Sequence, residues 1–354
     1  MMNMLVSSRR RAFVQGLGAA SLLSACGDPR ASHTVPIVEF GGLTMGSVYT
    51  VKIVGRKLSR TLQATARDAV AVALSAVDIA MSTHRPQSEL SRFNAHATTT
   101  SFALSPDMFS VFALAQQVSA ATGGAFDVTV GPIVDAWGFG PGRRERIVDA
   151  AEVGALERRV GWQMLRLDEK AGTIMKARPE VRADLSGIAK GYGVDKAAQA
   201  LDALGIEHYL IDAGGEVRTC GRNPEGRPWQ VAIEQPVAGR RRPRYVVPLS
   251  GLSIATSGDY RIFFERDGRR YSHEIDPATG QPIDNRLTSV SVVAATGTLA
   301  DAMGKLIVLG PQKGYALAVT QGVAAHFIVR ELDGRLRDLM TPAFAALGGM
   351  PFRA

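Results

Sequence analysis

The 354-residue chain contains few cysteines and few aromatic residues. Its two cysteines are Cys26 and Cys220, and aromatic side chains make up 6% of the residues. Two cysteines cannot build the disulfide framework that stabilises many small secreted domains. Paired cysteines and His-x-x-x-His spacings, which are typical of structural zinc sites, are also missing from the sequence. The composition therefore argues against a disulfide scaffold and against a structural zinc site.

Long apolar runs and two familiar catalytic motifs are missing as well. After residue 31 no apolar stretch approaches the length of a membrane-spanning helix. The phosphate loop G-x-x-x-x-G-K-[ST] and the nucleophile elbow G-x-S-x-G do not occur. A lone Gly16-x-Gly18 pattern lies inside the N-terminal targeting segment described below, so it does not indicate a dinucleotide-binding fold.

Positive charge exceeds negative charge, with 41 Lys and Arg against 33 Asp and Glu and a formal net charge of +8. This excess favours anionic partners. Part of it comes from Arg9 to Arg11 and part from an arginine cluster at 240–244, which is flanked by Pro236 and Gly239 and is typical of a solvated loop. No aromatic residues alternate with the basic ones, so the sequence gives no support to nucleic-acid binding.

With 46% apolar residues, the chain can bury a sizeable core.

The N-terminus has the pattern of an export and lipidation signal. Residues 8–13 resemble a twin-arginine signal, and an apolar stretch follows at 13–23. Leu23 to Cys26 resembles a bacterial lipobox; the alternative is a chance cysteine in an ordinary signal sequence. We therefore expect a signal peptide at 1–25, a tether at 26–36, and a periplasmic protein held at a membrane surface by lipid on Cys26. Cys220 then remains as the only other cysteine, without a disulfide partner.

The remaining chain has the pattern of a single α+β domain over residues 37–345. Strand-like alternation at 38–54 is interrupted at residues 44–47, and helical spacing covers 58–81 and 105–122. The second half is richer in strands, with helices expected at 299–309 and 310–321. The mixture of strand–helix units and hairpins predicts layers of helices on an antiparallel or mixed sheet. A small helical and hairpin insert is expected at 143–169.

The segment Arg182–Asp195 stands out because a small polar turn opens directly into a helix. Asp184, Ser186 and Gly187 form the turn, and Lys190 follows about one helical turn later. The first N–H groups of such a helix, together with an ammonium group, can bind an anion. The segment alone is equally compatible with a capped helix whose glycines permit close packing, so both interpretations stay open.

Small-residue turns beside acids and hydroxyls recur elsewhere. They occur at residues 211–215, 256–260 and 272–280, and Asp301 is a lone acid in a mostly apolar segment. A buried acid without a partner is costly, so Asp301 is expected to meet a cation or hydrogen-bond donors. Taken singly, each of these features is more often structural than functional.

Taken together and in order, these segments resemble the ApbE family of FAD:protein FMN transferases. The resemblance covers roughly residues 36–341. It is carried by the segments 45–47, 82–94, 125–127, 131–132, 137–140, 184–195, 212–215, 256–260, 272–280 and 300–302.

The resemblance implies magnesium-dependent transfer of FMN from FAD to a Thr or Ser hydroxyl of an acceptor protein, with release of AMP. Met45 and His84 would line the flavin. Asp184 and Lys190 would contact FAD, with Lys190 near the phosphates and counted among the catalytic residues. The adenosine side would be held by Ala125, Phe126 and Asp127.

The same resemblance implies a metal site and a catalytic base. The carbonyl of Gly187 and the carboxylate of Asp301 would bind Mg²⁺, which prefers oxygen ligands. His273 would act as the base for the acceptor hydroxyl. Ile275 would pack on the flavin. The acceptor protein is expected to carry a Ser/Thr flavinylation motif.

Lys305 departs from the family pattern. Members commonly have a metal-binding Thr four residues after the acid equivalent to Asp301, and an ammonium group cannot bind a cation. Three interpretations follow: Lys305 points elsewhere because the helix register shifts, its charge replaces the metal at the phosphates, or the protein binds FAD but transfers poorly. Two alternative functions therefore remain, a metal-dependent FAD pyrophosphatase releasing FMN and AMP, and a non-catalytic FAD-binding lipoprotein.

Overall fold

The computed structural model describes residues 35–55, 58–142, 144–237, 239 and 241–353. They belong to a compact unit that spans Thr34–Ala354. The predicted signal peptide at 1–25, Cys26 and most of the predicted tether lie outside the described residues. Within the described part of the chain, no helix has the length and apolar character needed to cross a membrane.

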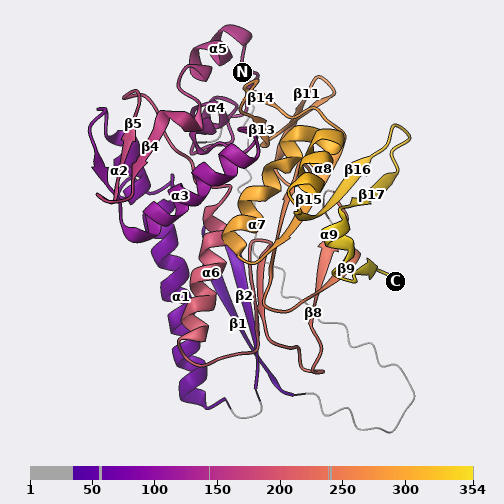
Figure 1. Cartoon of the computed structure of the whole chain (residues 1–354). Helices are drawn as coiled ribbons and strands as arrows, with labels where there is room; N and C mark the ends of the chain where they lie inside the picture. Colours follow the sequence, from indigo (N-terminus) through magenta and orange to yellow (C-terminus); the bar gives the residue numbers. More distant parts are fainter. Residues whose placement is uncertain (1–34, 56–57, 143, 238, 240, 354) are drawn as a thin grey trace, which may run out of the picture. The chain divides into compact units, whose positions relative to one another are not determined.

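An eight-stranded sheet forms the centre of this unit (Figure 1). Every pair of neighbouring strands in it is antiparallel. In spatial order the strands are β1 (Ile37–Thr44), β2 (Ser47–Val54), β6 (Tyr209–Ala213), β7 (Glu216–Cys220), β10 (Ser253–Gly258), β15 (Leu287–Ala294), β16 (Ala324–Arg330) and β17 (Leu336–Met340). The predicted α+β class with an antiparallel sheet is confirmed.

Helices cover one face of the sheet and a small sheet covers the other. The helices are α1 (Arg60–Met81), α6 (Ala189–Asp202) and α7 (Gly297–Met303). One core cluster joins α1 and α6 to β2 and β6. The small sheet consists of β8 (Trp229–Glu234), β9 (Pro243–Leu249) and β18 (Met350–Pro351). A second core cluster fills the space between it and the central sheet, and β18 extends the folded unit beyond the predicted end at residue 345.

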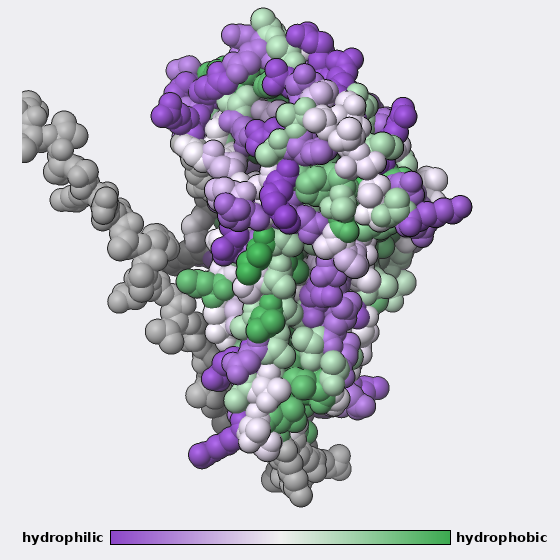
Figure 2. Space-filling model, turned by 90° about the vertical axis from the view of Figure 1, so that its left-hand side faces the viewer, coloured by the Kyte–Doolittle hydropathy of each residue, from purple (hydrophilic) through white to green (hydrophobic). Residues whose placement is uncertain are grey.

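Helix α1 shows why the helical layer forms. Ser59 caps its N-terminus, because the side-chain oxygen accepts a hydrogen bond from Leu62 N at 3.1 Å. Its buried residues recur at intervals of three or four positions from Ala66 to Met81, which places them on one face. On its other face, Val72 and Ile79 are exposed. Figure 2, which views the side on which α1 lies in Figure 1, shows apolar and polar residues interspersed.

A mostly helical region lies between α1 and α6 in the sequence. Ser105 caps α3 as predicted, with Ser105 Oγ accepting from Met108 N at 3.3 Å. The predicted insert at 143–169 holds a helix and the first strand of a hairpin that continues to residue 176. The elements are α2 (Glu89–Ala95), β3 (Phe102–Ala103), α3 (Pro106–Ala121), α4 (Gly131–Ala136), α5 (Ala150–Glu157), β4 (Leu165–Asp168), β5 (Thr173–Lys176) and the 3-10 turns η1 (Val128–Val130) and η2 (Trp162–Met164).

The predicted helix at 299–309 differs from the structure. Helix α7 begins earlier, at Gly297, because Thr296 caps it, and after Met303 the chain continues as the 3-10 helix η3 (Gly304–Leu309). The change coincides with Gly304, where a Cβ would lie 2.7 Å from Ser257 Oγ. The other elements of the second half are β11 (Phe263–Arg266), β12 (Arg269–Ser272), β13 (Ile275–Asp276), β14 (Gln281–Pro282), α8 (Gly310–Thr320) and α9 (Pro342–Ala345).

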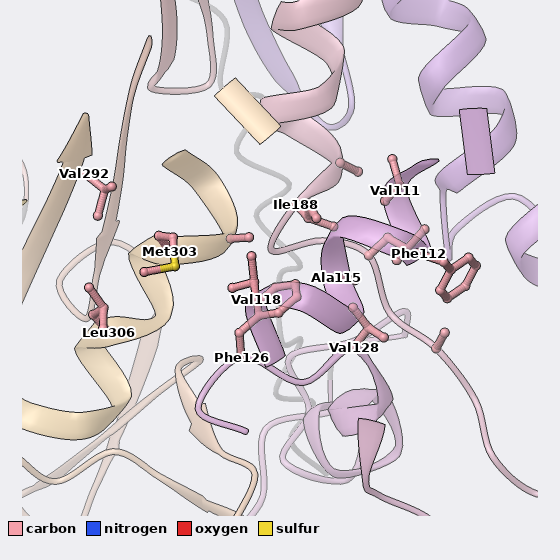
Figure 3. Close-up of a cluster of buried hydrophobic side chains, with 14 of the residues drawn as sticks. Val111, Phe112, Ala115, Val118, Phe126, Val128, Ile188, Val292, Met303 and Leu306 are labelled. Carbon is pink, nitrogen blue, oxygen red and sulfur yellow. The ribbon is translucent and has the colours of Figure 1, made fainter. Parts of the chain in front are cut away.

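The largest core cluster fixes the position of α7 and η3. Val118 of α3, Phe126 and Met303 belong to it, together with Leu306 of η3 and Ile188 at the start of α6 (Figure 3). Because these side chains come from four separate segments, their packing holds the start of α6 and the α7–η3 segment in fixed positions. Both segments carry predicted site residues.

Candidate active site

The polar turn before α6 is held from two sides. Asn94 of α2 bonds to Ala183 twice: Asn94 Oδ1 accepts from Ala183 N at 2.7 Å, and Asn94 Nδ2 donates to Ala183 O at 2.8 Å. Asp184 N donates to Val128 O, and Asp184 Oδ1 accepts from Ser186 N at 2.8 Å. The N-cap residue of α6, Ile188, makes no side-chain cap bond. Ile188 itself therefore caps no N–H group of α6, but Ala189 N donates to Leu185 O and Gly191 N donates to Asp301 Oδ2, so two of the first three N–H groups of the helix are already bonded.

The glycines of this segment allow α6 and α7 to cross closely. A Cβ at residue 191 would lie 2.2 Å from Gly297 O, and a Cβ at residue 297 would lie 2.6 Å from Gly191 O. The carboxylate of Asp195 accepts hydrogen bonds from the N–H groups of Gly297 and Thr298 at 2.7 and 2.8 Å. Asp301 Oδ2 accepts from Gly191 N at 2.9 Å. Close packing, one of the two interpretations of the motif, thus accounts for Gly191.

Lys190 pairs with a buried acid that sequence reasoning missed. Its ammonium group donates to Glu216 Oε1, and Glu216 is 3% exposed at the start of β7. Burial opposes the charge on Lys190, but Glu216 and then Asp301 outweigh it and raise the pKa of Lys190. Burial, and to a lesser extent Asp301, holds the pKa of Glu216 above its ordinary value despite the pairing. Among the described residues, Glu216 Oε2 is buried without a hydrogen-bond partner.

His273, Glu274 and Lys305 form a second charged cluster. Lys305 Nζ donates to Glu274 Oε2 at 2.5 Å, and His273 Nε2 lies 3.6 Å from Glu274 Oε1. His273 Nδ1 lies 3.1 Å from Ile262 O, which can only accept a hydrogen bond. Burial lowers the pKa of His273, Glu274 raises it and Lys305 lowers it. Burial opposes the charge on Glu274, yet Lys305 and then His273 hold its pKa below the ordinary value.

Lys305 faces the same cavity as the polar turn. A Cβ at residue 187 would lie 3.0 Å from Lys305 Cε and 3.6 Å from an edge atom of the Phe126 ring. Lys305 therefore lies on the cavity wall, with its ammonium group directed at Glu274. The register does change at Gly304, but the 3-10 turn leaves the side chain on the cavity wall.

Asp127 uses its carboxylate to shape the loop after α3. Asp127 Oδ1 accepts from Thr129 N and Thr129 Oγ1 at 2.7 and 2.6 Å, and Oδ2 accepts from Trp162 N at 2.8 Å. Burial raises the pKa of Asp127, and these hydrogen bonds oppose the shift. Ala125 and Phe126 are buried beside it. All three residues lie on the cavity wall.

Met45 lies at the tip of the β1–β2 hairpin, in a backbone conformation that non-glycine residues rarely adopt. Its φ is 45°, and that of Gly46 is 71°. Its methyl group packs on α6, where a Cβ at residue 193 would lie 2.8 Å from it. His84 is exposed at the rim beside this tip. Such strain is found at functional sites when the surrounding packing holds it.

Ile275 is 5% exposed and packs in a separate core cluster with Ile133 and Trp137. Trp137 Nε1 donates to Gly280 O at 2.9 Å, so the segment 131–140 supports the loop that carries His273 and Ile275.

Most of the predicted site residues line two adjoining cavities. One has a volume of about 360 Å³ and the other about 500 Å³, within the range of small-molecule sites. Both are lined by Met45, His84 and Asp184. Lys190 lines the larger, and the smaller is also lined by Ala125, Phe126, Asp127, Gly187, His273 and Ile275. Asp301 does not line either cavity; it lies buried against the Gly191 backbone.

Two functional candidates were not found from the sequence. Glu216 directly follows the segment 211–215, and Glu274 lies inside the segment 272–280. Their signal was an acid in a buried strand or loop. Their lysine partners are 26 and 31 residues away, a distance at which sequence pattern gives no pairing.

A family model described as the ApbE family matches residues 45–327, a range that includes every residue lining the two cavities. The chain belongs to the ApbE family. A FAD:protein FMN transferase of Haemophilus influenzae is 42% identical over 306 residues, which cover 84% of this chain and 88% of that protein. A FAD:protein FMN transferase of Vibrio cholerae is 41% identical over 329 residues, covering 92% and 95%.

Solved structures of the ApbE family agree with the fold. The flavin transferase ApbE from Vibrio cholerae has a TM-score of 0.80 and 38% identity, and the match covers 88% of this chain and 99% of that one. The apo form of the Pseudomonas stutzeri flavinyl transferase ApbE has a TM-score of 0.80, 40% identity and coverage of 88% and 97%. With relatives of this similarity, this ApbE-family chain is a transferase.

The residues fit one magnesium ion, although the described residues include no cluster of three or more His, Cys, Asp or Glu side chains suited to a metal. Magnesium is commonly held by one or two carboxylates plus substrate phosphates. Asp301 and Glu216 place two carboxylates near the single ammonium of Lys190, and one Glu216 oxygen lacks a partner among the described residues. A second carboxylate beside one ammonium favours either a cation or a proton at Glu216, whose pKa burial raises. The Glu274 carboxylate neutralises Lys305 in place, which weakens its repulsion of such a cation.

Proposed function

We propose that this protein is a FAD:protein FMN transferase. It transfers FMN from FAD to a Thr or Ser hydroxyl of an acceptor protein that carries a flavinylation motif, releases AMP and requires Mg²⁺. The observation that carries the proposal is the convergence of Lys190, Asp184, Gly187 and His273 on two adjoining cavities of ligand size. The relatives named FAD:protein FMN transferase support it.

The reaction is a phosphoryl transfer, which depends mainly on positioning and on neutralising charge. The acceptor oxygen forms a bond to the phosphorus on the FMN side, and the bond from that phosphorus to the bridging oxygen breaks. The bridging oxygen leaves with AMP. Lys190 brings an ammonium group to the cavity wall beside the opening of α6, where it can balance the negative charge of the phosphates.

His273 is placed to accept the proton of the acceptor hydroxyl. A hydrogen bond from Nδ1 to Ile262 O leaves the lone pair on Nε2. Burial lowers the pKa of His273, so the neutral form that can take a proton prevails near neutral pH. Once Nε2 carries the proton, it lies 3.6 Å from the carboxylate of Glu274, which stabilises the imidazolium.

A bound Mg²⁺ would add divalent charge next to the pyrophosphate and stabilise the leaving phosphate. Asp301 and the carbonyl of Gly187 are the residues we assign to hold it. The hydrogen bond from Gly191 N fixes the Asp301 carboxylate against α6, so the helix orients this ligand.

The proposal extends to the cellular location. The twin-arginine and lipobox patterns favour export and a lipid anchor on Cys26, which would hold the enzyme on the periplasmic side of a membrane. A Cys26→Ser variant is expected to leave the membrane fraction and to appear in soluble periplasm. Retention of that variant in the membrane fraction would contradict the lipid anchor.

The proposed activity is tested by incubating the protein with FAD, Mg²⁺ and an acceptor protein that carries a Ser/Thr flavinylation motif. Intact-mass measurement is expected to show covalent FMN on the acceptor, and none on an acceptor whose target Thr is replaced by Ala. AMP formation without modified acceptor would indicate FAD hydrolysis instead. Tight FAD binding with neither product would indicate a non-catalytic flavin-binding protein.

A further inference from the structure

Lys305 occupies a defined position between two groups of the candidate site. Its alkyl chain passes over Gly187, where a Cβ would lie 3.0 Å from Lys305 Cε. Its ammonium group meets Glu274 Oε2 at 2.5 Å. Gly187 belongs to the turn that opens α6, so the Lys305 side chain lies beside the start of that helix.

Glu274 accepts one hydrogen bond from the Lys305 ammonium group, which leaves its other N–H donors available. A lysine ammonium has three N–H donors, and of the described residues only Glu274 accepts one of them. The carboxylate of Glu274 is almost fully buried, while the side chain of Lys305 keeps 23% of its surface exposed and lines the 360 Å³ cavity. The remaining donors can therefore reach an anion in the cavity.

Keeping Lys305 charged also costs little free energy. A lone buried ammonium would be unfavourable, and the carboxylate compensates it in place. Both residues line the same cavity, but the Lys305 side chain keeps 23% of its surface exposed against 3% for Glu274, so the ammonium is the more accessible of the two charges. Charge-assisted hydrogen bonds to phosphate oxygens are among the stronger polar contacts in proteins.

We propose that Lys305, held by Glu274, is a phosphate-binding residue that contacts the pyrophosphate of the dinucleotide substrate. This inference rests on the proposed function, because FAD is the dinucleotide in question. The contact acts alongside the metal and does not depend on it. Part of the affinity for FAD is therefore expected to persist when magnesium is removed.

The test compares FAD with riboflavin, which has the same ring system but no phosphate. Dissociation constants are measured from flavin fluorescence in EDTA with the full chain. The informative variant is the double substitution Lys305→Met with Glu274→Gln, which removes both charges and leaves no unpaired buried carboxylate. It is expected to bind FAD about tenfold more weakly than the wild type. Its affinity for riboflavin is expected to be unchanged.

Two further variants isolate the role of the ammonium. Glu274→Gln alone keeps Lys305 and is expected to retain most of the FAD affinity. Lys52→Met removes an exposed lysine of β2, 4.0 Å from Glu39, and is expected to change neither affinity. Unfolding temperatures of all variants confirm that each protein is folded.

The outcomes separate this inference from the proposed function. If the double variant binds FAD as tightly as the wild type, Lys305 does not contact phosphate and the inference fails while the function stands. If FAD and riboflavin affinities fall together, the pair only shapes the cavity and the inference also fails. If the wild type does not bind FAD, the proposed function fails and the inference fails with it.

Discussion

His273 is the residue on which the chemistry of the proposed site depends most. His273→Ala is expected to lower the FMN-transfer rate by about 10²–10⁴-fold, the usual contribution of a general base. FAD binding is expected to remain, because the imidazole is assigned to the acceptor hydroxyl. The matched control is His96→Ala, since His96 is bonded to Thr98 and Thr100 on the surface. Equal rates for His273→Ala and the wild type would rule out His273 as the base.

The pH dependence of the transfer rate is expected to report the pKa of His273, which its neighbours determine. His273 faces Glu274 directly, and the ammonium groups of Lys305 and Lys190 oppose the effect of that carboxylate. Burial lowers the pKa of His273, so the rate is expected to fall only when the pH drops below about 6.5, the ordinary value. Glu274→Gln removes the group that raises this pKa. The acid limb of the pH–rate profile is then expected to move to lower pH, and an unmoved limb would contradict the assignment.

Asp301 tests the metal assignment without disturbing the backbone. Asp301→Asn keeps an oxygen that can accept the hydrogen bond of Gly191 N, but it removes the negative charge. The Mg²⁺ concentration for half-maximal transfer is expected to rise about tenfold or more, because ligand charge sets the affinity for hard cations. Measuring the rate against Mg²⁺ concentration checks this. The unfolding temperature should stay close to that of the wild type, which separates a metal effect from a folding defect.

At the scale of elements, the crossing of α6 and α7 positions both Lys190 and Asp301. Gly191→Ala would place a Cβ 2.2 Å from Gly297 O, so the helices must separate. The expected destabilisation is about 1–3 kcal/mol, measured as the free energy of unfolding in denaturant. Gly154→Ala on α5 is the matched control, because its Cβ would meet no atom within 4 Å. That variant is expected to be neutral or slightly stabilised, and equal losses for the two would contradict the packing argument.

Local sequence patterns predicted most of these elements correctly. Ser105 before Pro106 marked the start of α3, and the alternation at 38–54 marked the β1–β2 hairpin, because caps and strand periodicity act within a few residues. The helix at 299–309 was predicted as one element, yet it changes to 3-10 winding at Gly304. At Gly304 the chain packs so closely on Ser257 of the distant strand β10 that a Cβ would lie 2.7 Å from Ser257 Oγ. No local pattern contains such a contact.

The candidate site likewise has features that the sequence predicted and features that depend on the folded structure. The resemblance to a family named many of the residues that line the cavities, although Asp301 lines neither of them. The acids that pair with the two lysines were not predicted. Glu216 and Glu274 gain their roles only through the ion pairs with Lys190 and Lys305, which the folded chain brings together. The orientation of Lys305 also could not be predicted, since it depends on the local winding of η3.

At the scale of the whole folded unit, one partly buried charged cluster joins the central sheet to the small sheet behind it. Asp338 of β17 accepts from Arg244 of β9 at 2.8 and 2.6 Å, and its Oδ1 lies 2.8 Å from His326 Nε2. Burial opposes the charge on Asp338, but His326 and then Arg244 lower its pKa to about 2. The cluster lies on the face of the sheet opposite α6 and α7, so it affects stability and not the chemistry of the site.

This cluster makes a prediction about acid stability. Folding lowers the pKa of Asp338 from 3.8 to about 2, so the unfolded chain binds the proton more readily in this interval. The stabilisation is therefore present above about pH 4 and is lost as the pH falls toward 2. Asp338→Asn should lower the free energy of unfolding at about pH 6 and should differ less from the wild type at about pH 3. A difference that is independent of pH would contradict this account.

The central claim concerns the whole molecule: segments from residue 45 to residue 305 meet to transfer FMN from FAD to a protein hydroxyl. The most direct test measures AMP release and covalently bound FMN in one reaction with FAD, Mg²⁺ and an acceptor protein. Transfer predicts equal amounts of the two products, and neither product when the acceptor hydroxyl is removed. AMP release that continues without an acceptor, or an acceptor that gains no FMN, would contradict the claim.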